Sequence, residues 1–167
     1  MNIFVLDMNP EIAAQYLCDA HIRKMAVEAA QMLCNNFTES QLWFAPRTVF
    51  GTFRKHSHLN HPCSVWARQS IESFQWLYIH GIAICDEHKK RFPNDKALTR
   101  KVLNWCYENV NLCQFPKSGL TEFPFCLPDK YKTDNVVESY RRFYIEDKKF
   151  ATWKLGNVPF WYQTIGN

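Results

Sequence analysis

Glycine is scarce in this chain, with only five among 167 residues. That scarcity disfavours a β-rich fold full of tight turns, and the glycine patterns of phosphate-binding loops and dinucleotide folds are missing as well. No apolar run approaches the roughly 20 residues that a membrane span requires. The opening residues, MNIFVLDMNPE, lack the basic start of a secretory signal. We therefore expect neither a membrane span nor secretion.

The seven cysteines include no C-x-x-C pair, and their number is odd. In a chain too large to be a disulfide scaffold, this pattern favours reduced thiols and predicts a cytoplasmic protein.

Apolar residues make up 47% of the chain and charged residues 22%, which is typical of a globular protein. A chain of this length forms one domain and buries enough surface to fold without a disulfide or a metal. We therefore expect a single domain over residues 1–167, most simply a monomer. The net charge of +4 and the 16% aromatic content are compatible with a polyanionic partner but do not identify one.

Capping residues and apolar spacing predict about four helices. Asn9, Pro10 and Glu11 have the order of an N-cap, a first-turn proline and an acid at the positive end of the helix dipole. The predicted helices run from Asn9 to about Leu33, from Asn60 to Arg91, from Asp95 to about Leu112, and over about 134–147 after Thr133 or Asp134. Residues 3–6 form either a short strand or an arm packed in the core. The predicted fold class is all-α, a single compact domain with long irregular loops at 36–61 and 114–132.

The first predicted helix carries a polar stripe opposite its apolar face, at steps of three, four and three: His21, Lys24, Glu28 and Gln31. A line of acid, base and amide groups suits an active-site wall, with Glu28 as a carboxylate beside a cation. The same spacing is also that of a solvated helix face, where a Lys–Glu pair contributes roughly 0.2–0.5 kcal/mol. Periodicity alone favours the solvated face.

Residues 56–63, HSHLNHPC, hold three histidines and one cysteine. A zinc site would need His56, His58, His61 and Cys63 together, but their spacing matches none of the usual finger pairings. We therefore predict no metal and no other cofactor. The segment is better explained as a loop in which Asn60 caps the next helix and His61, with the first-turn amides, meets a phosphate.

Basic residues recur beside aromatic ones, as at Arg54 and Lys55 after Phe53, and the chain ends near Trp161 and Tyr162. Cations for phosphates and rings for stacking are the chemistry of nucleic-acid contact. The pattern is weak by itself, because most aromatic side chains of a small domain lie in its core.

Four short motifs, in their order along the chain, resemble the phage pyrimidine-dimer DNA glycosylase/lyase family and its bacterial relatives. The motifs are the segment 19–33 with its V-E-A-x-Q-x-L end, Asn60-His61-Pro62 before Trp66 and Arg68, the basic helix end at 89–92, and Pro159-x-Trp161-Tyr162. Together they touch most of the chain.

The resemblance implies an all-α protein that binds DNA, bends the duplex and flips a base out of the stack. The family's chemistry uses the N-terminal amine as a nucleophile at the sugar C1′, together with a Glu on the first long helix. An α-amine suits this role because it is partly deprotonated at neutral pH. The implied catalytic residues are Asp19, His21, Lys24, Glu28 and Met1; the implied DNA contacts are Arg54, Lys55, Asn60, His61, Arg68, Trp161 and Tyr162.

This sequence departs from the family pattern at two places. Residue 2 is Asn, so we expect Met1 to be retained, the amine to be displaced by one residue, and no imine adduct to form. The family's catalytic Glu aligns at or near His21, with Glu28 two turns further on. Three functions stay open: an N-glycosylase acting on a flipped pyrimidine, a transferase on the same scaffold making hypermodified phage DNA, or a non-enzymatic DNA-binding or inhibitor protein. A phage-encoded chain would act in the cytoplasm of its bacterial host.

Overall fold

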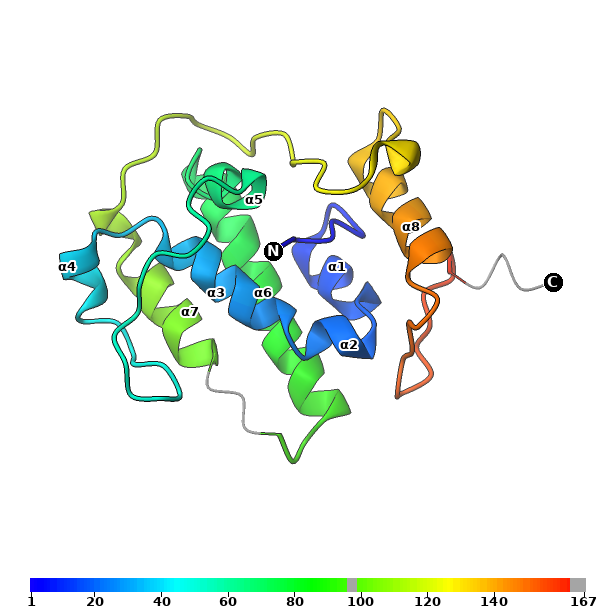
Figure 1. The fold of residues 1–167 in the computed structure, drawn as a ribbon, viewed down its shortest axis with the longest axis horizontal. Coiled ribbons are helices and arrows are strands. Elements are labelled where there is room, and N and C mark those ends of the chain that lie inside the picture. The colour runs from blue at the N-terminus through cyan, green and yellow to red at the C-terminus, as the bar shows by residue number, and fades with distance from the viewer. Residues whose placement is uncertain (96–98, 163–167) are drawn as a thin grey trace.

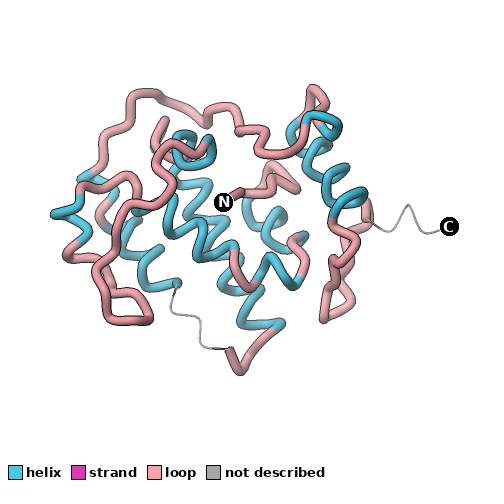
Figure 2. Tube along the Cα trace, in the orientation of Figure 1, coloured by secondary structure: helices cyan, strands magenta, loops and turns pink. Residues whose placement is uncertain are grey.

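The computed structural model describes residues 1–95 and 99–162, and every regular element in those ranges is helical (Figures 1 and 2). The described elements are α1 (Pro10–Tyr16), α2 (Asp19–Ile22), α3 (Met25–Cys34), α4 (Glu39–Leu42), α5 (Pro62–Trp66), α6 (Ile71–Arg91), α7 (Thr99–Glu108), η1 (Val110–Leu112), η2 (Asp129–Tyr131) and α8 (Val136–Asp147). The all-α prediction is confirmed, with more and shorter helices than the predicted four. None of the described helices is long and apolar enough to cross a membrane.

The first predicted helix, from Asn9 to Leu33, is in fact three helices, so its continuity was wrong. Asn9 does cap α1, because its side chain accepts hydrogen bonds from the two following backbone N–H groups of Glu11 and Ile12. The chain then becomes extended at Leu17 and Cys18 before α2 begins. Without a Gly or Pro, the sequence between these residues carries no local signal for the break.

A buried arginine from a distant helix explains where α1 ends. Arg91 is 1% exposed and donates hydrogen bonds to the carbonyl oxygens of Gln15 (2.8 Å) and Leu17 (2.7 Å). Its charge is balanced by Glu87 at 3.0 Å and by Asp19 at 3.3 Å. A guanidinium has five donors in a fixed fork, and here they satisfy carbonyl groups that a continuing helix would have used.

The second predicted helix is also divided, because residues 67–70 separate α5 from α6. Ser70 restarts the helix by accepting a hydrogen bond from the backbone N–H of Ser73 at 3.1 Å. The predicted end at Arg91 is confirmed. The cap of α5 is not Asn60 as predicted but His61, whose Nδ1 accepts the N–H of Cys63 at 3.2 Å.

The remaining helices follow the predictions more closely. The start predicted at Asp95 leads into residues 96–98, which lie outside the described part, and α7 with η1 ends at Leu112 as expected. Asn135, one or two residues later than predicted, caps α8. The loop at 36–61 contains α4, which begins with a capping box formed by Thr38 and Gln41.

The long helix α6 runs through the middle of the molecule and packs against α1, α2, α3 and α7 (Figure 1). It lies close to two neighbours at Gly81, where an added Cβ would lie 3.1 Å from Leu103 and 3.3 Å from Ala29. Glycine costs roughly 1 kcal/mol in a helix relative to alanine. At this position it permits the close packing of α3, α6 and α7.

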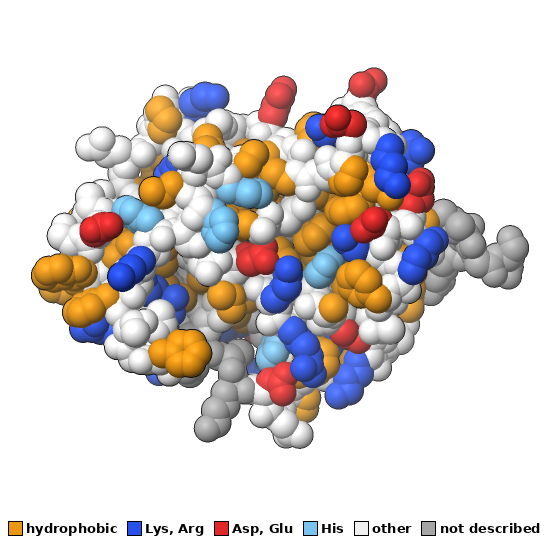
Figure 3. All heavy atoms as spheres, viewed as in Figure 1, with side chains coloured by type: hydrophobic (Ala, Val, Ile, Leu, Met, Phe, Trp, Pro, Cys, Tyr) orange, Lys and Arg blue, Asp and Glu red, His pale blue; other side chains and the backbone are white. Residues whose placement is uncertain are grey.

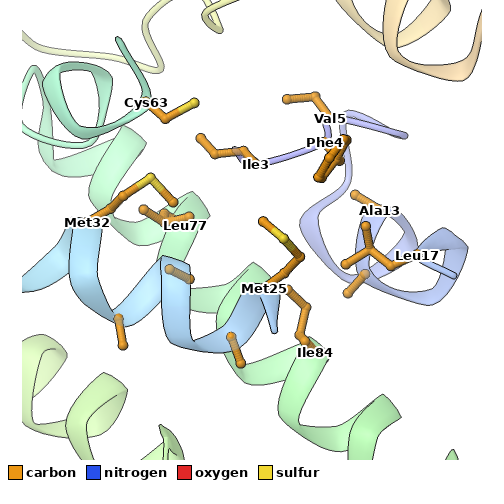
Figure 4. Packing of buried hydrophobic residues seen from close by; sticks show 14 of the residues in the cluster. Ile3, Phe4, Val5, Ala13, Leu17, Met25, Met32, Cys63, Leu77 and Ile84 are labelled. Carbon is orange, nitrogen blue, oxygen red and sulfur yellow. The ribbon is translucent and has the colours of Figure 1, made fainter. Parts of the chain in front are cut away.

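Residues 3–6 form an arm buried in the core, the second of the two predicted forms (Figure 4). Ile3 and Val5 are 1% and 0% exposed. Phe4 has a φ of 53°, a strained value for a bulky side chain. Its ring is held by stacking on His21, with the centroids 4.3 Å apart. The arm thereby brings the start of the chain to the centre of the fold.

Two buried histidines make stability depend on pH. Burial lowers the pKa of His21 and of His80 from the ordinary 6.5 to about 4. The positive charges of Lys24 and Lys148 lower the pKa of His21 further. His80 Nδ1 donates to the carbonyl of Pro10 at 2.9 Å. Both side chains are therefore neutral in the folded protein near neutral pH.

We expect the free energy of unfolding to fall as the pH drops from 6.5 to 4, by about 1.4 kcal/mol per pH unit for each histidine. The unfolded chain takes up these protons first, so the stabilisation is complete above pH 6.5 and is lost toward pH 4. Denaturant unfolding across this range measures the slope.

In the variant His80→Gln, the free energy of unfolding should change less steeply with pH, because one of the two histidines no longer contributes. This holds whatever the absolute stability of the variant. His58→Asn is the control, because His58 is exposed and Asn tolerates its positive φ of 52°. An unchanged slope in His80→Gln would contradict a buried, neutral His80.

Candidate active site

The carboxylate of Glu28 lies where the start of the chain meets α3. Its Oε2 accepts the backbone N–H of Asn2 at 2.9 Å and lies 3.8 Å from the amine of Met1. Its Oε1 lies 3.2 Å from Nζ of Lys24, one helical turn earlier. The Glu28 side chain is 16% exposed and that of Met1 is 2% exposed. One carboxylate is thus shared by two amines, of which that of Lys24 is exposed.

Asn2 locks this end of the arm in place. Its Oδ1 accepts the backbone N–H groups of Ile3 and Phe4, at 2.8 and 3.2 Å, and the hydroxyl of Tyr140 at 3.0 Å. Its Nδ2 donates to the carbonyl of Cys126 at 2.8 Å. No local pattern distinguishes Tyr140 or Cys126, because they lie on α8 and in the loop before it, far along the chain from Asn2.

Three side chains of types that can bind a metal converge near the start of the chain. The side-chain donor atoms of His61, Cys63 and Cys126 all lie within 4.8 Å of one another, and the two sulfurs are 3.4 Å apart. The cluster of His56, His58, His61 and Cys63, against which the spacing argued, does not form among the described residues. His56 Nε2 bonds to the carbonyl of Phe37 and His58 Nδ1 to the hydroxyl of Ser57, each at 2.7 Å.

The charges around Glu28 affect this cluster. Burial lowers the pKa of His61, as do the positive charges of the Met1 amine and His58, whereas Glu28 opposes the change. The hydrogen bond from the Cys63 thiol lowers the pKa of Cys126 to about 7, and the same bond with burial raises that of Cys63. Cys126 is the more acidic of the two thiols.

The predicted polar stripe is only partly realised, because α2 and α3 are separate helices. Lys24 and Glu28 do pair. His21 turns inward instead, where its ring contacts Phe4 and forms a very short hydrogen bond with Tyr144. Gln31 lines a separate cavity of about 450 Å³ beside the loop at 47–54.

The carboxylate of Asp19 binds a different set of residues from that of Glu28. The Asp19 carboxylate accepts the backbone N–H of Lys154 at 2.8 Å and the hydroxyl of Thr152 at 3.3 Å, and it pairs with Arg91. These contacts tie the C-terminal segment to α2.

Some of the predicted phosphate contacts bind backbone carbonyl groups of the protein itself, and others are exposed to solvent. Arg54 donates to the carbonyl of Pro46 at 2.7 Å and Arg68 to that of Leu59 at 2.8 Å, so both hold loops. Lys55 and Asn60 are exposed.

At the C-terminal end, Trp161 is 7% exposed and packs edge-on against Tyr16 and Tyr144. Tyr162 is half-buried, and its hydroxyl donates to the carbonyl of Lys148 at 3.1 Å. Both rings therefore pack within the protein.

The face that carries the N-terminus displays acidic and basic side chains near its centre, with histidines beside them (Figure 3). The loop after α4 adds aromatic side chains that sequence reasoning missed. Trp43, Phe44 and Phe50 are 64%, 82% and 88% exposed. Arg47 lies over the ring of Phe53, 3.2 Å from its centroid.

The carboxylate and the amine together can carry out proton transfer when the amine nitrogen attacks a carbon atom. The charge of a carboxylate beside an amine can stabilise the positive charge that develops as the nitrogen attacks, and the carboxylate can then accept the proton that the nitrogen loses.

The sequence model of one family, described as pyrimidine dimer DNA glycosylase, matches residues 1–100, more than half of the chain. Comparison with curated proteins and with solved structures finds no match. The matched residues include the arm, Glu28, His61 and Cys63. The chain therefore belongs to the pyrimidine dimer DNA glycosylase family.

Proposed function

We propose that this protein is an N-glycosylase that removes a damaged pyrimidine from duplex DNA, with Glu28 as its catalytic carboxylate. The observation that carries the proposal is the position of Glu28 Oε2, 2.9 Å from the nitrogen of Asn2 and 3.8 Å from that of Met1. The nitrogen of either of the first two residues therefore meets the same carboxylate oxygen. This contact supports Glu28, rather than a residue at the position of His21, as the family's acid.

The proposed reaction begins when the neutral amine of Met1 attacks the sugar C1′. A bond forms between this nitrogen and C1′, and the bond between C1′ and the base breaks. The base leaves with the bonding electron pair and takes up a proton. The negative charge of Glu28 first stabilises the positive charge that develops on the sugar, and Glu28 then accepts the proton that the amine loses.

Opening of the sugar ring then gives an imine between Met1 and C1′, and the ring oxygen takes up a proton. Hydrolysis of the imine returns the free amine and leaves an abasic site. The displacement of the amine by one residue led to the expectation that no imine forms. The 3.8 Å contact with Glu28 leads us to propose that it does.

The exposed aromatic loop supports binding to duplex DNA. Apolar side chains inserted between base steps unstack them, and aromatic rings stack on bases that leave the helix. Phe44 and Phe50 have this exposure, and Lys55 follows in the same loop. Extruding a base costs a few kcal/mol, least where the base is already damaged.

The variant Glu28→Gln tests the carboxylate. We expect cleavage of the bond between base and C1′ to slow by roughly 10²–10⁴-fold, the usual contribution of a positioned acid or base. The substrate is a duplex carrying one cyclobutane thymine dimer, and the abasic site is measured because the detached base stays joined to its neighbour through the cyclobutane ring. Gln still accepts the N–H of Asn2, so the fold should persist, and loss of one negative charge should leave DNA affinity equal or slightly higher.

Glu146→Gln is the matched control, because Glu146 also pairs with a cation one turn away, Arg142 at 2.9 Å, and should keep wild-type activity. Mass spectrometry of the digested DNA identifies the product. An enlarged base in place of an abasic site would show a transferase, and binding with intact bases would show a non-enzymatic protein. Either product, or full activity in Glu28→Gln, would overturn the proposal.

DNA affinity should depend strongly on salt, with a log–log slope of about −0.9 for each phosphate contact. We expect Lys55→Gln to reduce the magnitude of this slope by about one contact, measured by fluorescence anisotropy with a labelled duplex. Lys90→Gln, at the end of α6, should keep the wild-type slope. Equal slopes for the Lys55→Gln and wild-type proteins would remove Lys55 from the DNA interface.

A further inference from the structure

We propose that His61, Cys63 and Cys126 form a binding site for one zinc ion. Their three donor atoms lie within 4.8 Å of one another, and they come from the cap of α5, its first turn and the loop before η2. The spacing of residues 56–63 predicted no metal because that segment lacks one of the three ligands. The missing partner, Cys126, is 63 positions beyond Cys63.

The distances suit a metal better than a disulfide. Two thiolates bound tetrahedrally at about 2.3 Å from zinc lie about 3.8 Å apart. The Sγ atoms of Cys63 and Cys126 are 3.4 Å apart, whereas a disulfide needs about 2.05 Å. A shift of a few tenths of an ångström in either cysteine side chain brings the two sulfurs to the separation that zinc requires. Both cysteines are free thiols in this structure.

The ligands are held in place by hydrogen bonds from residues around them. The backbone N–H of Cys126 donates to the hydroxyl of Tyr140 at 3.0 Å, and its carbonyl accepts from Asn2 at 2.8 Å. Tyr140 and Cys63 are fully buried. Fixed ligands reduce the ordering that metal binding requires, and such outer contacts tune the affinity of metal sites.

Two cysteines and one histidine favour zinc among the common divalent cations, because magnesium and calcium prefer oxygen ligands. Three protein ligands leave the fourth tetrahedral position for water or an added ligand. The ion would join α5 to the loop before η2, next to the Asn2 contacts that hold the arm (Figure 4 shows Cys63 facing Ile3). The proposal does not require the glycosylase reaction, in which the metal has no step.

Cobalt(II) tests the site directly, because its bonds to thiolates absorb in the near ultraviolet. The full-length protein, reduced and stripped of metal with a chelator, is titrated with Co²⁺ and then with Zn²⁺, in the absence of DNA. We expect the thiolate-to-cobalt band to saturate at one ion per chain and to disappear as Zn²⁺ displaces Co²⁺.

Two variants remove one ligand each while preserving the fold. Cys126→Ser changes a half-buried side chain, and His61→Asn keeps a good helix cap. Each should weaken binding at least about 100-fold, since loss of an outer hydrogen bond alone costs about 10–100-fold. Cys113→Ser, half-buried in the same stretch of loop, and His58→Asn should bind as the wild type does.

A folded, reduced wild-type protein that shows no thiolate-to-cobalt band would overturn the proposal, as would wild-type affinity for cobalt in Cys126→Ser. Circular dichroism of each protein establishes that it is folded. The variant Glu28→Gln should bind cobalt normally. Loss of metal binding and loss of the proposed glycosylase activity are therefore distinguishable.

Discussion

The hydrogen bond from the backbone N–H of Asn2 to Glu28 holds the first residues of the chain next to α3. The candidate active site depends on this hydrogen bond. The arm that follows is buried between α1, α3, α5 and α8 (Figures 1 and 4). Asn2 satisfies the polar groups at its start, and packing of Phe4 on His21 holds a backbone conformation that is strained by itself. The buried arm thereby brings an amine to a carboxylate on α3. Rigid placement of this kind is what the proposed reaction requires.

Local signals in the sequence were sufficient for the features that neighbouring residues determine. The start of α1 at Asn9, the end of α6 at Arg91 and the pairing of Lys24 with Glu28 are all set by residues within a turn or two. The break after α1 could not be predicted, because the guanidinium that takes its carbonyl groups comes from Arg91, 74 positions after Leu17. Cys126 was missed for the same reason: its partners are distant in the chain.

The candidate site includes residues that lie beyond the part of the chain matched by the family model. Residues 1–100 match the family and supply Glu28, the arm, His61 and Cys63. The loop and helix beyond this match complete the surroundings, since Cys126 and Tyr140 hold Asn2 from the other side. Local pattern therefore predicted the pairing of Glu28 with Lys24, whereas the contact of Glu28 with the start of the chain comes from segments that only the tertiary structure brings together.

The central claim is that the amine at the start of the chain attacks C1′ beside Glu28, and chemical trapping of the imine tests it most directly. Intact mass first establishes which residue carries the free α-amine. The protein is then mixed with duplex DNA containing one thymine dimer in the presence of borohydride, which reduces an imine to a stable bond. The account predicts a covalent protein–DNA adduct that peptide mapping places on the nitrogen of Met1. Formation of an abasic site without an adduct, or an adduct on Lys24, would contradict it.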